Sequence, residues 1–132
     1  MNNVELRVKG IVKRDDKYLV IKHFIDDRIP EPFMWEFIDG SVNFGESPDD
    51  AVRRLIMEKL RAAGSIDRIL YTWNNMLGDT QCVGIAYLCH VDDNAEFQLT
   101  EEYGGYEWIS RSEFGNYIEN LYVLKDLEGV EL

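Results

Sequence analysis

Apolar and polar residues alternate along the first part of the chain, the pattern of a half-buried β-strand. The alternation runs through residues 4–14 and resumes through residues 17–24, after the pair Asp15-Asp16. Two such runs joined by two turn-forming residues predict a β-hairpin. Gly10 lies inside the first run and is a candidate for a β-bulge.

Shorter apolar runs further along predict more strands, because turn-forming Pro, Gly, Asn and Asp separate them. The run at residues 81–91 is almost continuously apolar, which indicates a central strand buried on both faces. The other predicted strands span residues 35–38, 66–73, 96–99 and 106–109, and loops are expected at residues 25–33 and 74–80.

One long helix is marked by its first residues. Ser47 is a natural N-cap, Pro48 falls at the first helical position, and Asp50 completes a Ser-x-x-Asp capping box. Gly64 is the candidate for the left-handed residue that ends the helix. A helix that reaches Gly64 would pass through Arg61 and add nearly one turn.

A second helix is predicted near the carboxyl end. Ser110 and Glu113 form another capping box, and the helix is expected to extend through residues 117–127. The order of elements, with strands before and after each helix, predicts an α+β sandwich with a mixed sheet between helices. A length of 132 residues is expected to form one domain, residues 1–132.

Composition excludes some partners and locations. The net charge of −11 argues against binding to a nucleic-acid backbone, which requires clustered cations. No apolar run is long enough to span a membrane and the first residues do not resemble a signal peptide, so a cytoplasmic location is expected. Cys82 and Cys89 lie on one predicted strand, so we expect two buried free thiols.

The central stretch from Trp35 to Gly64 carries a motif. Gly40, Glu46, Arg54, Ile56, Glu58 and Ala62 stand at the spacings of the signature of the Nudix hydrolases, which this sequence resembles. The lead-in at residues 35–40 is similar to that family's Trp-x-Phe-Pro-Gly-Gly, and residues 101–108 are similar to a further family motif. Three positions depart from the signature: Leu55 and Lys59 replace Glu, and Arg61 replaces Gly.

The resemblance implies a Nudix-type α/β/α sandwich and a pyrophosphohydrolase that uses Mg²⁺ or Mn²⁺. Its substrate would be a nucleoside diphosphate linked to a group X. Glu side chains at helix positions 55, 58 and 59 would share a face and converge on the metal. In this chain only Glu58 remains, because Leu55 cannot bind metal and is expected to pack, while Lys59 repels a cation. Activity is therefore expected to be weakened or lost.

Three interpretations stay open. In the first, Lys59 supplies part of the charge of the missing metal, and the chain is a non-catalytic ligand-binding or regulatory module for a small phosphorylated ligand. In the second, Glu46, Glu58 and either Glu101 or Glu102 hold one weak metal ion and residual turnover survives. In the third, an exposed apolar surface mediates protein interaction, with a homodimer as one expected assembly.

The candidate residues follow from these interpretations. Arg54, Glu58 and Glu46 are the catalytic candidates, with Arg54 expected to position the carboxylates as in the family; the metal candidates are Glu58, Glu102 and Glu101. The substrate-binding candidates are Gly40, Trp35, Lys59 and Asn75. Aromatic rings at Phe33, Trp35, Trp73 or Tyr103 would stack a nucleobase, unless they belong to the core or to an interface.

Overall fold

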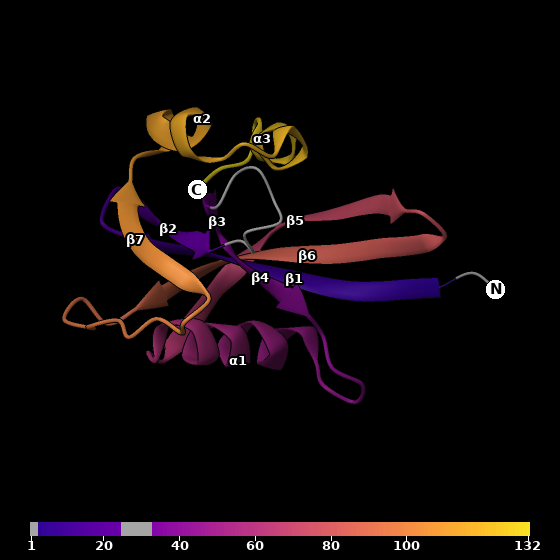
Figure 1. Ribbon diagram of the computed structural model, residues 1–132, viewed down its shortest axis with the longest axis horizontal. Coiled ribbons are helices and arrows are strands. Elements are labelled where there is room, and N and C mark those ends of the chain that lie inside the picture. The colour runs from indigo at the N-terminus through magenta and orange to yellow at the C-terminus, as the bar shows by residue number, and fades with distance from the viewer. Residues whose placement is uncertain (1–2, 25–32) are drawn as a thin grey trace.

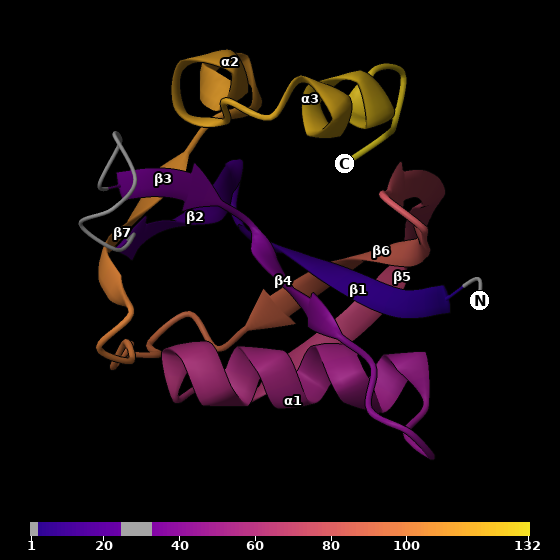
Figure 2. The same ribbon diagram turned by 45° about the vertical axis from the view of Figure 1, so that its right-hand side comes forward.

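The computed structural model describes residues 3–24 and 33–132, and this part of the chain folds as three layers (Figure 1). A mixed β-sheet lies in the middle, helix α1 (Pro48–Leu60) covers one face, and helices α2 (Phe114–Tyr117) and α3 (Leu121–Leu127) lie over the other (Figure 2). The α+β sandwich predicted from the order of elements is confirmed.

Seven strands form the sheet that the structure describes. Their order is β3-β2-β1-β6-β5, while β4 pairs with β1 and β7 pairs with β2. The pair β1–β6 is parallel and the other pairs are antiparallel. The strands are β1 (Asn3–Arg14), β2 (Lys17–Phe24), β3 (Phe33–Glu36), β4 (Ile38–Ser41), β5 (Gly64–Leu77), β6 (Thr80–Val91) and β7 (Tyr103–Ile109).

The hairpin of β1 and β2 is as predicted, but the prediction of a β-bulge at Gly10 is wrong. The pairing of β1 with β6 keeps its register without a break through Gly10. A glycine fits there for another reason, because a Cβ atom would come within 3.0 Å of Val52 Cγ2 on α1. The close approach of helix and strand therefore accounts for this residue.

Several predicted boundaries also change. The single strand expected at residues 35–38 is two strands, β3 and β4, and the strand expected at 66–73 extends from Gly64 to Leu77. The extension shortens the turn expected at 74–80 to Gly78-Asp79, with Gly78 at φ 64°. Residues 96–99 are not a strand. Most of the loop expected at 25–33 lies outside the described residues.

Helix α1 begins as predicted and ends earlier. The Ser47 side chain accepts a hydrogen bond from the Asp50 amide at 3.1 Å, and Pro48 occupies the first turn. The helix ends at Leu60, and Arg61 takes the left-handed conformation with φ 56°. The prediction that Gly64 ends a longer helix is therefore wrong, since Gly64 begins β5.

The carboxyl-terminal helices are shorter than predicted. The Ser110–Glu113 capping interaction is present and opens a 3-10 turn that leads into α2. A continuous helix through residues 117–127 is not formed, because the chain leaves helical geometry at Ile118 and restarts with Asn120 as the N-cap of α3.

The sheet divides the core into two clusters. On the α1 face, apolar side chains of β1, β2, β4 and β6 pack against the helix, and on the other face a second cluster packs against α2 and α3. Cys82 and Cys89 are buried free thiols, as predicted. In the described ranges no helix is both long and apolar enough to cross a bilayer.

Candidate functional site

The edge of β4 that faces away from β1 is covered by two cations from α1. In an antiparallel pair, alternate residues direct their carbonyl groups away from the partner strand. Lys59 Nζ donates to the carbonyl oxygen of Asp39 at 2.6 Å, and Arg54 Nη2 donates to that of Ser41 at 2.8 Å. These contacts fix the helix to the strand that precedes it.

Arg54 also organises the carboxylates at the start of α1. Its guanidinium donates to both carboxylate oxygens of Glu46, at 2.9 and 3.1 Å, and forms an ion pair with Glu58 at 3.2 Å. The hydrogen bond from Arg54 is the main cause that holds the pKa of Glu46 below its ordinary value. The structure therefore brings together the three residues predicted as catalytic, with Glu46 held more closely than Glu58.

The helix position that carries Leu55 faces the core. The Leu55 side chain is 5% exposed and belongs to the cluster on the α1 face. A Cβ atom on Gly40 would lie only 2.6 Å from Leu55 Cδ2, so these two residues pack closely. Leu55 packs as expected, and the structure places Gly40, a predicted substrate-binding residue, against it.

The carboxylates predicted to hold a metal are not grouped together in the described residues. Glu101 and Glu102 are exposed in the turn before β7, and Glu102 accepts a hydrogen bond from Thr100 at 3.2 Å. Within residues 3–24 and 33–132, no three His, Cys, Asp or Glu side chains are grouped so that they could hold an ion. The Asp39 carbonyl, an oxygen of the kind that Mg²⁺ binds, already accepts the ammonium of Lys59.

A pocket opens on the opposite face of the sheet, between the sheet and the α3 region. It consists of two hollows of about 190 and 90 Å³ whose walls share Lys9, Asp39 and Asn120. Asn75 lines the larger hollow and Trp35 lines the smaller. The structure therefore places two predicted substrate-binding residues in one pocket.

Asp39 connects this pocket with the α1 side. Its carboxylate accepts two hydrogen bonds from Arg7, at 2.6 and 3.2 Å, and lies 3.6 Å from Lys9 Nζ. Its carbonyl group accepts the hydrogen bond from Lys59. Three cations from two elements thus converge on one acidic residue.

Glu36 provides a second connection between the pocket and the α1 side of the sheet. It lines the smaller hollow, and burial raises the pKa of its carboxyl group although Lys59 acts in the opposite direction. Burial raises the pKa of Tyr103, the charge of Glu36 acts in the same direction, and Lys59 Nζ lies 5.4 Å from the centre of the Tyr103 ring. Tyr103 is 8% exposed, so its ring is a wall of the core and does not offer a free stacking surface.

A family model described as "NUDIX domain" matches residues 5–127. The chain belongs to the Nudix family.

Individual relatives agree with this assignment. The nucleoside triphosphatase NudI of Escherichia fergusonii is 28% identical over 127 residues, which cover 89% of each chain. A MutT Nudix hydrolase from Burkholderia pseudomallei has a TM-score of 0.78 at 22% identity, covering 98% of this chain and 100% of that one. The MutT protein from Methanosarcina mazei has a TM-score of 0.78 at 19% identity, covering 96% and 92%. The sandwich is therefore the Nudix fold, as the motif predicted.

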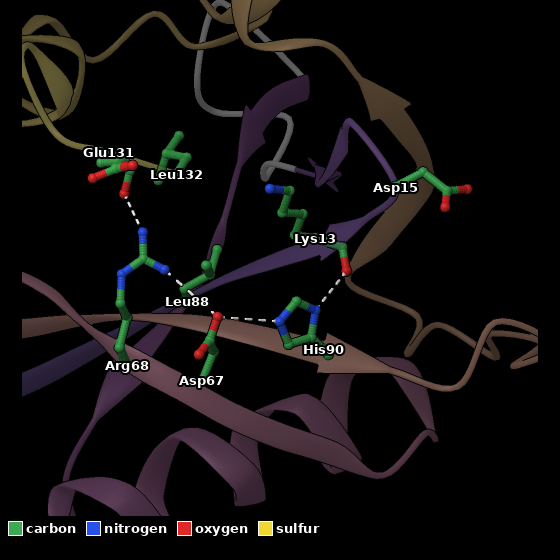
Figure 3. Close-up of a pocket in the computed structure, with 8 residues that line it drawn as sticks. All are labelled: Lys13, Asp15, Asp67, Arg68, Leu88, His90, Glu131 and Leu132. Atoms are coloured by element: carbon green, nitrogen blue, oxygen red, sulfur yellow. Dashed lines mark hydrogen bonds and ion pairs between the residues drawn. The ribbon is translucent and has the colours of Figure 1, made fainter.

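Another hollow of this Nudix domain lies on β5 and β6, near the carboxyl end of the chain. It measures about 520 Å³, and Asp67 pairs with both Arg68 and His90 on its wall (Figure 3). His90 lies 3.5 Å from Asp67 and 3.2 Å from the Lys13 carbonyl, while Arg68 donates to the Glu131 carbonyl at 2.6 Å. Because Asp67, Arg68 and His90 already have partners and no lining residue belongs to the Nudix signature, we do not assign the ligand site here.

Sequence reasoning missed Lys9 and Asn120 as pocket residues, and it gave Asp39 no role in binding. A usable signal was present in the alternation of residues 4–9, which places Glu5, Arg7 and Lys9 on one face of β1. Since helices cover both faces of the central strands in this Nudix sandwich, that polar row has to lie under a helix layer. A polar row beneath a layer of structure indicates a pocket or a buried ion pair.

Proposed function

We propose that this Nudix domain binds a small phosphorylated ligand, of the nucleoside diphosphate-X class, without a divalent metal, and that its hydrolytic activity is weakened or lost. The observation that carries the proposal is the 2.6 Å hydrogen bond from Lys59 Nζ to the carbonyl oxygen of Asp39. It sets a positive charge on a carbonyl oxygen, which is the kind of atom that Mg²⁺ binds.

The helix supports binding better than hydrolysis. Hydrolysis of a pyrophosphate requires charge neutralisation and an activated water, which metal-bound carboxylates supply. Here Leu55 is buried, and Glu46 and Glu58 both pair with Arg54. The Lys59 ammonium, by contrast, retains donors for a phosphate after giving one to the Asp39 carbonyl.

The ligand class rests on the pocket and on the relatives. Asn75 and Trp35 line hollows that adjoin the Lys59 side through Asp39 and Glu36, an arrangement suited to a ligand with a phosphorylated end and a ring. NudI of Escherichia fergusonii carries the description nucleoside triphosphatase. We extend from that relative only the nucleotide character of the ligand.

The test is calorimetric titration with ADP-ribose, uridine diphosphate and inorganic pyrophosphate, in chelator and again with Mg²⁺ or Mn²⁺. We expect affinities within about twofold between the two conditions. Lys59→Met should weaken pyrophosphate binding about tenfold, the loss expected for one charge-assisted hydrogen bond. Lys17→Met, which removes an exposed lysine at the start of β2, is the matched control and should leave affinity unchanged.

Turnover of the same compounds is measured in parallel. Binding that requires Mg²⁺, or nucleotide hydrolysis that chelator abolishes, would overturn the proposal and favour the interpretation in which Glu46, Glu58 and Glu101 or Glu102 hold a weak metal ion. Circular dichroism of Lys59→Met separates a lost contact from a lost fold, because Lys59 also anchors β4.

A further inference from the structure

Lys9 is a buried charge on a pocket wall. Its side chain is 7% exposed, and it is the single buried polar or charged residue found in the described part of the chain. It nevertheless lines both hollows of the pocket between the sheet and the α3 region. A buried ammonium is costly unless hydrogen bonds and an opposite charge compensate it.

The compensation of Lys9 is incomplete. The nearest carboxylate oxygen, Asp39 Oδ2, lies 3.6 Å from Lys9 Nζ. A charged hydrogen bond is usually about 2.8 Å long, so this contact is too long to be one. The other oxygen of Asp39 is occupied by Arg7 at 2.6 Å. Burial is the leading influence on the pKa of Lys9 and lowers it, with only partial opposition from Asp39 and Asp126.

An indole ring holds the ammonium in place. Lys9 Nζ lies 4.4 Å from the centre of the Trp73 ring, within cation–π range. A Cβ atom on Gly84 would fall 2.1 Å from that ring, so only glycine lets the indole lie against β6. Trp73 therefore has the strand on one side and Lys9 near its face, so it supports the lysine and does not offer a free stacking surface.

The surroundings specify the partner that Lys9 lacks. Two cations, Arg7 and Lys9, and two carboxylates, Asp39 and Asp126, line the larger hollow, so their charges balance and a neutral group fits better than an anion. A volume of about 190 Å³ admits a planar ring system.

We propose that Lys9 and Asp39 select the ligand by one edge of its ring, where Lys9 donates to an acceptor atom and Asp39 Oδ2 accepts from an adjacent N–H. The ligand group is a neutral heteroaromatic ring with a hydrogen-bond acceptor beside a donor. The inference rests on the proposed function, because it names what the pocket recognises at the end of the ligand remote from Lys59.

The test uses probes that differ at the donor atom alone. Uridine diphosphate and inosine diphosphate are each compared with the counterpart methylated at the ring N–H, with inorganic pyrophosphate as the probe without a ring. We expect the wild type to bind at least one parent compound about tenfold more tightly than its methylated counterpart. Lys9→Met should weaken binding of that parent compound about tenfold and reduce the preference to less than threefold, with pyrophosphate binding unchanged.

Stability gives an independent readout for the same variants. Lys9→Met removes a poorly compensated charge and keeps the length of the side chain, so its unfolding midpoint should equal or exceed that of the wild type. Lys9→Gln, which keeps a neutral donor, should retain part of the preference. Should Lys9→Met fail to fold, the comparison of Lys9→Gln with the wild type decides the outcome.

The failures of the two proposals are distinguishable. Loss of metal-free pyrophosphate binding in the wild type contradicts the proposed function. Normal pyrophosphate binding with equal affinity for parent and methylated compounds contradicts the selection by Lys9 and Asp39 alone, as does a preference that Lys9→Met leaves intact.

Discussion

Lys9 and Lys59 reach the same residue from opposite faces of the sheet. Lys59 comes from α1 and donates to the Asp39 carbonyl at 2.6 Å, while Lys9 comes from β1 and stays 3.6 Å from the Asp39 carboxylate. The first lysine is half-buried and satisfied at one donor, and the second is buried and poorly compensated. The difference teaches that the role of a lysine depends on its unsatisfied donors more than on its charge.

The largest expected effect comes from Asp39, which both lysines contact. Asp39→Asn keeps the carbonyl for Lys59 but removes the charge opposite Lys9 and Arg7. We expect the free energy of unfolding to fall by about 3 kcal/mol, because a buried cation loses its counter-charge. Urea denaturation measures the change, and Asp16→Asn in the exposed β1–β2 turn is the control.

The double variant Lys9→Met/Asp39→Asn sharpens the result. Removing the buried ammonium together with its partner should recover more than half of the lost stability, since no uncompensated charge remains. Additive losses in the double variant would show that Lys9 and Asp39 do not interact energetically.

A somewhat smaller loss of stability is expected when Leu55 is replaced. Leu55→Ala opens a cavity between α1 and Gly40, so the free energy of unfolding should fall by about 2–3 kcal/mol. Met57→Ala, an exposed position on the same helix, should change stability by less than about 0.5 kcal/mol. Equal effects at both positions would remove the argument that this helix position serves packing on the Lys59 side.

The smallest effect is a pH dependence of opposite sign at two carboxylates. Arg54 lowers the pKa of Glu46, so Glu46 contributes stability above its ordinary pKa of 4.5 that is lost as pH falls through the lowered value. Burial raises the pKa of Glu36, whose contribution is present below 4.5 and is lost as pH rises through the raised value. Denaturation midpoints of Glu46→Gln and Glu36→Gln across this range should therefore deviate from the wild type in opposite directions.

The start of α1 could be predicted from sequence and its end could not. The cap at Ser47 depends on residues three apart in the chain, so local chemistry is sufficient. The end is set by tertiary contacts, because the Gln98 amide donates to the Leu60 carbonyl at 3.0 Å and Arg61 accepts a left-handed conformation that usually favours glycine. Residues 96–99 are a loop that contacts this helix end, which explains why the predicted strand is absent.

The candidate site likewise has residues that the sequence could predict and residues that it could not. The convergence of Arg54, Glu46 and Glu58 followed from motif spacing, and the structure places them in contact. The burial of Lys9 depends on α3, which lies over the strand that carries Lys9 but is distant in sequence. The sequence around Lys9 therefore does not predict its burial. Trp73 could not be assigned from sequence either, since its position depends on Gly84 in the neighbouring strand.

The covering of β4 by Lys59 and Arg54 has a consequence for self-association. A short strand with outward carbonyl groups is a template onto which another extended chain can add, and such edges promote aggregation unless something blocks them. The two cations occupy the outward oxygens of Asp39 and Ser41 with side chains from the same molecule. Lys59, which stands where the Nudix signature has Glu, therefore also blocks this sheet edge against the addition of another strand.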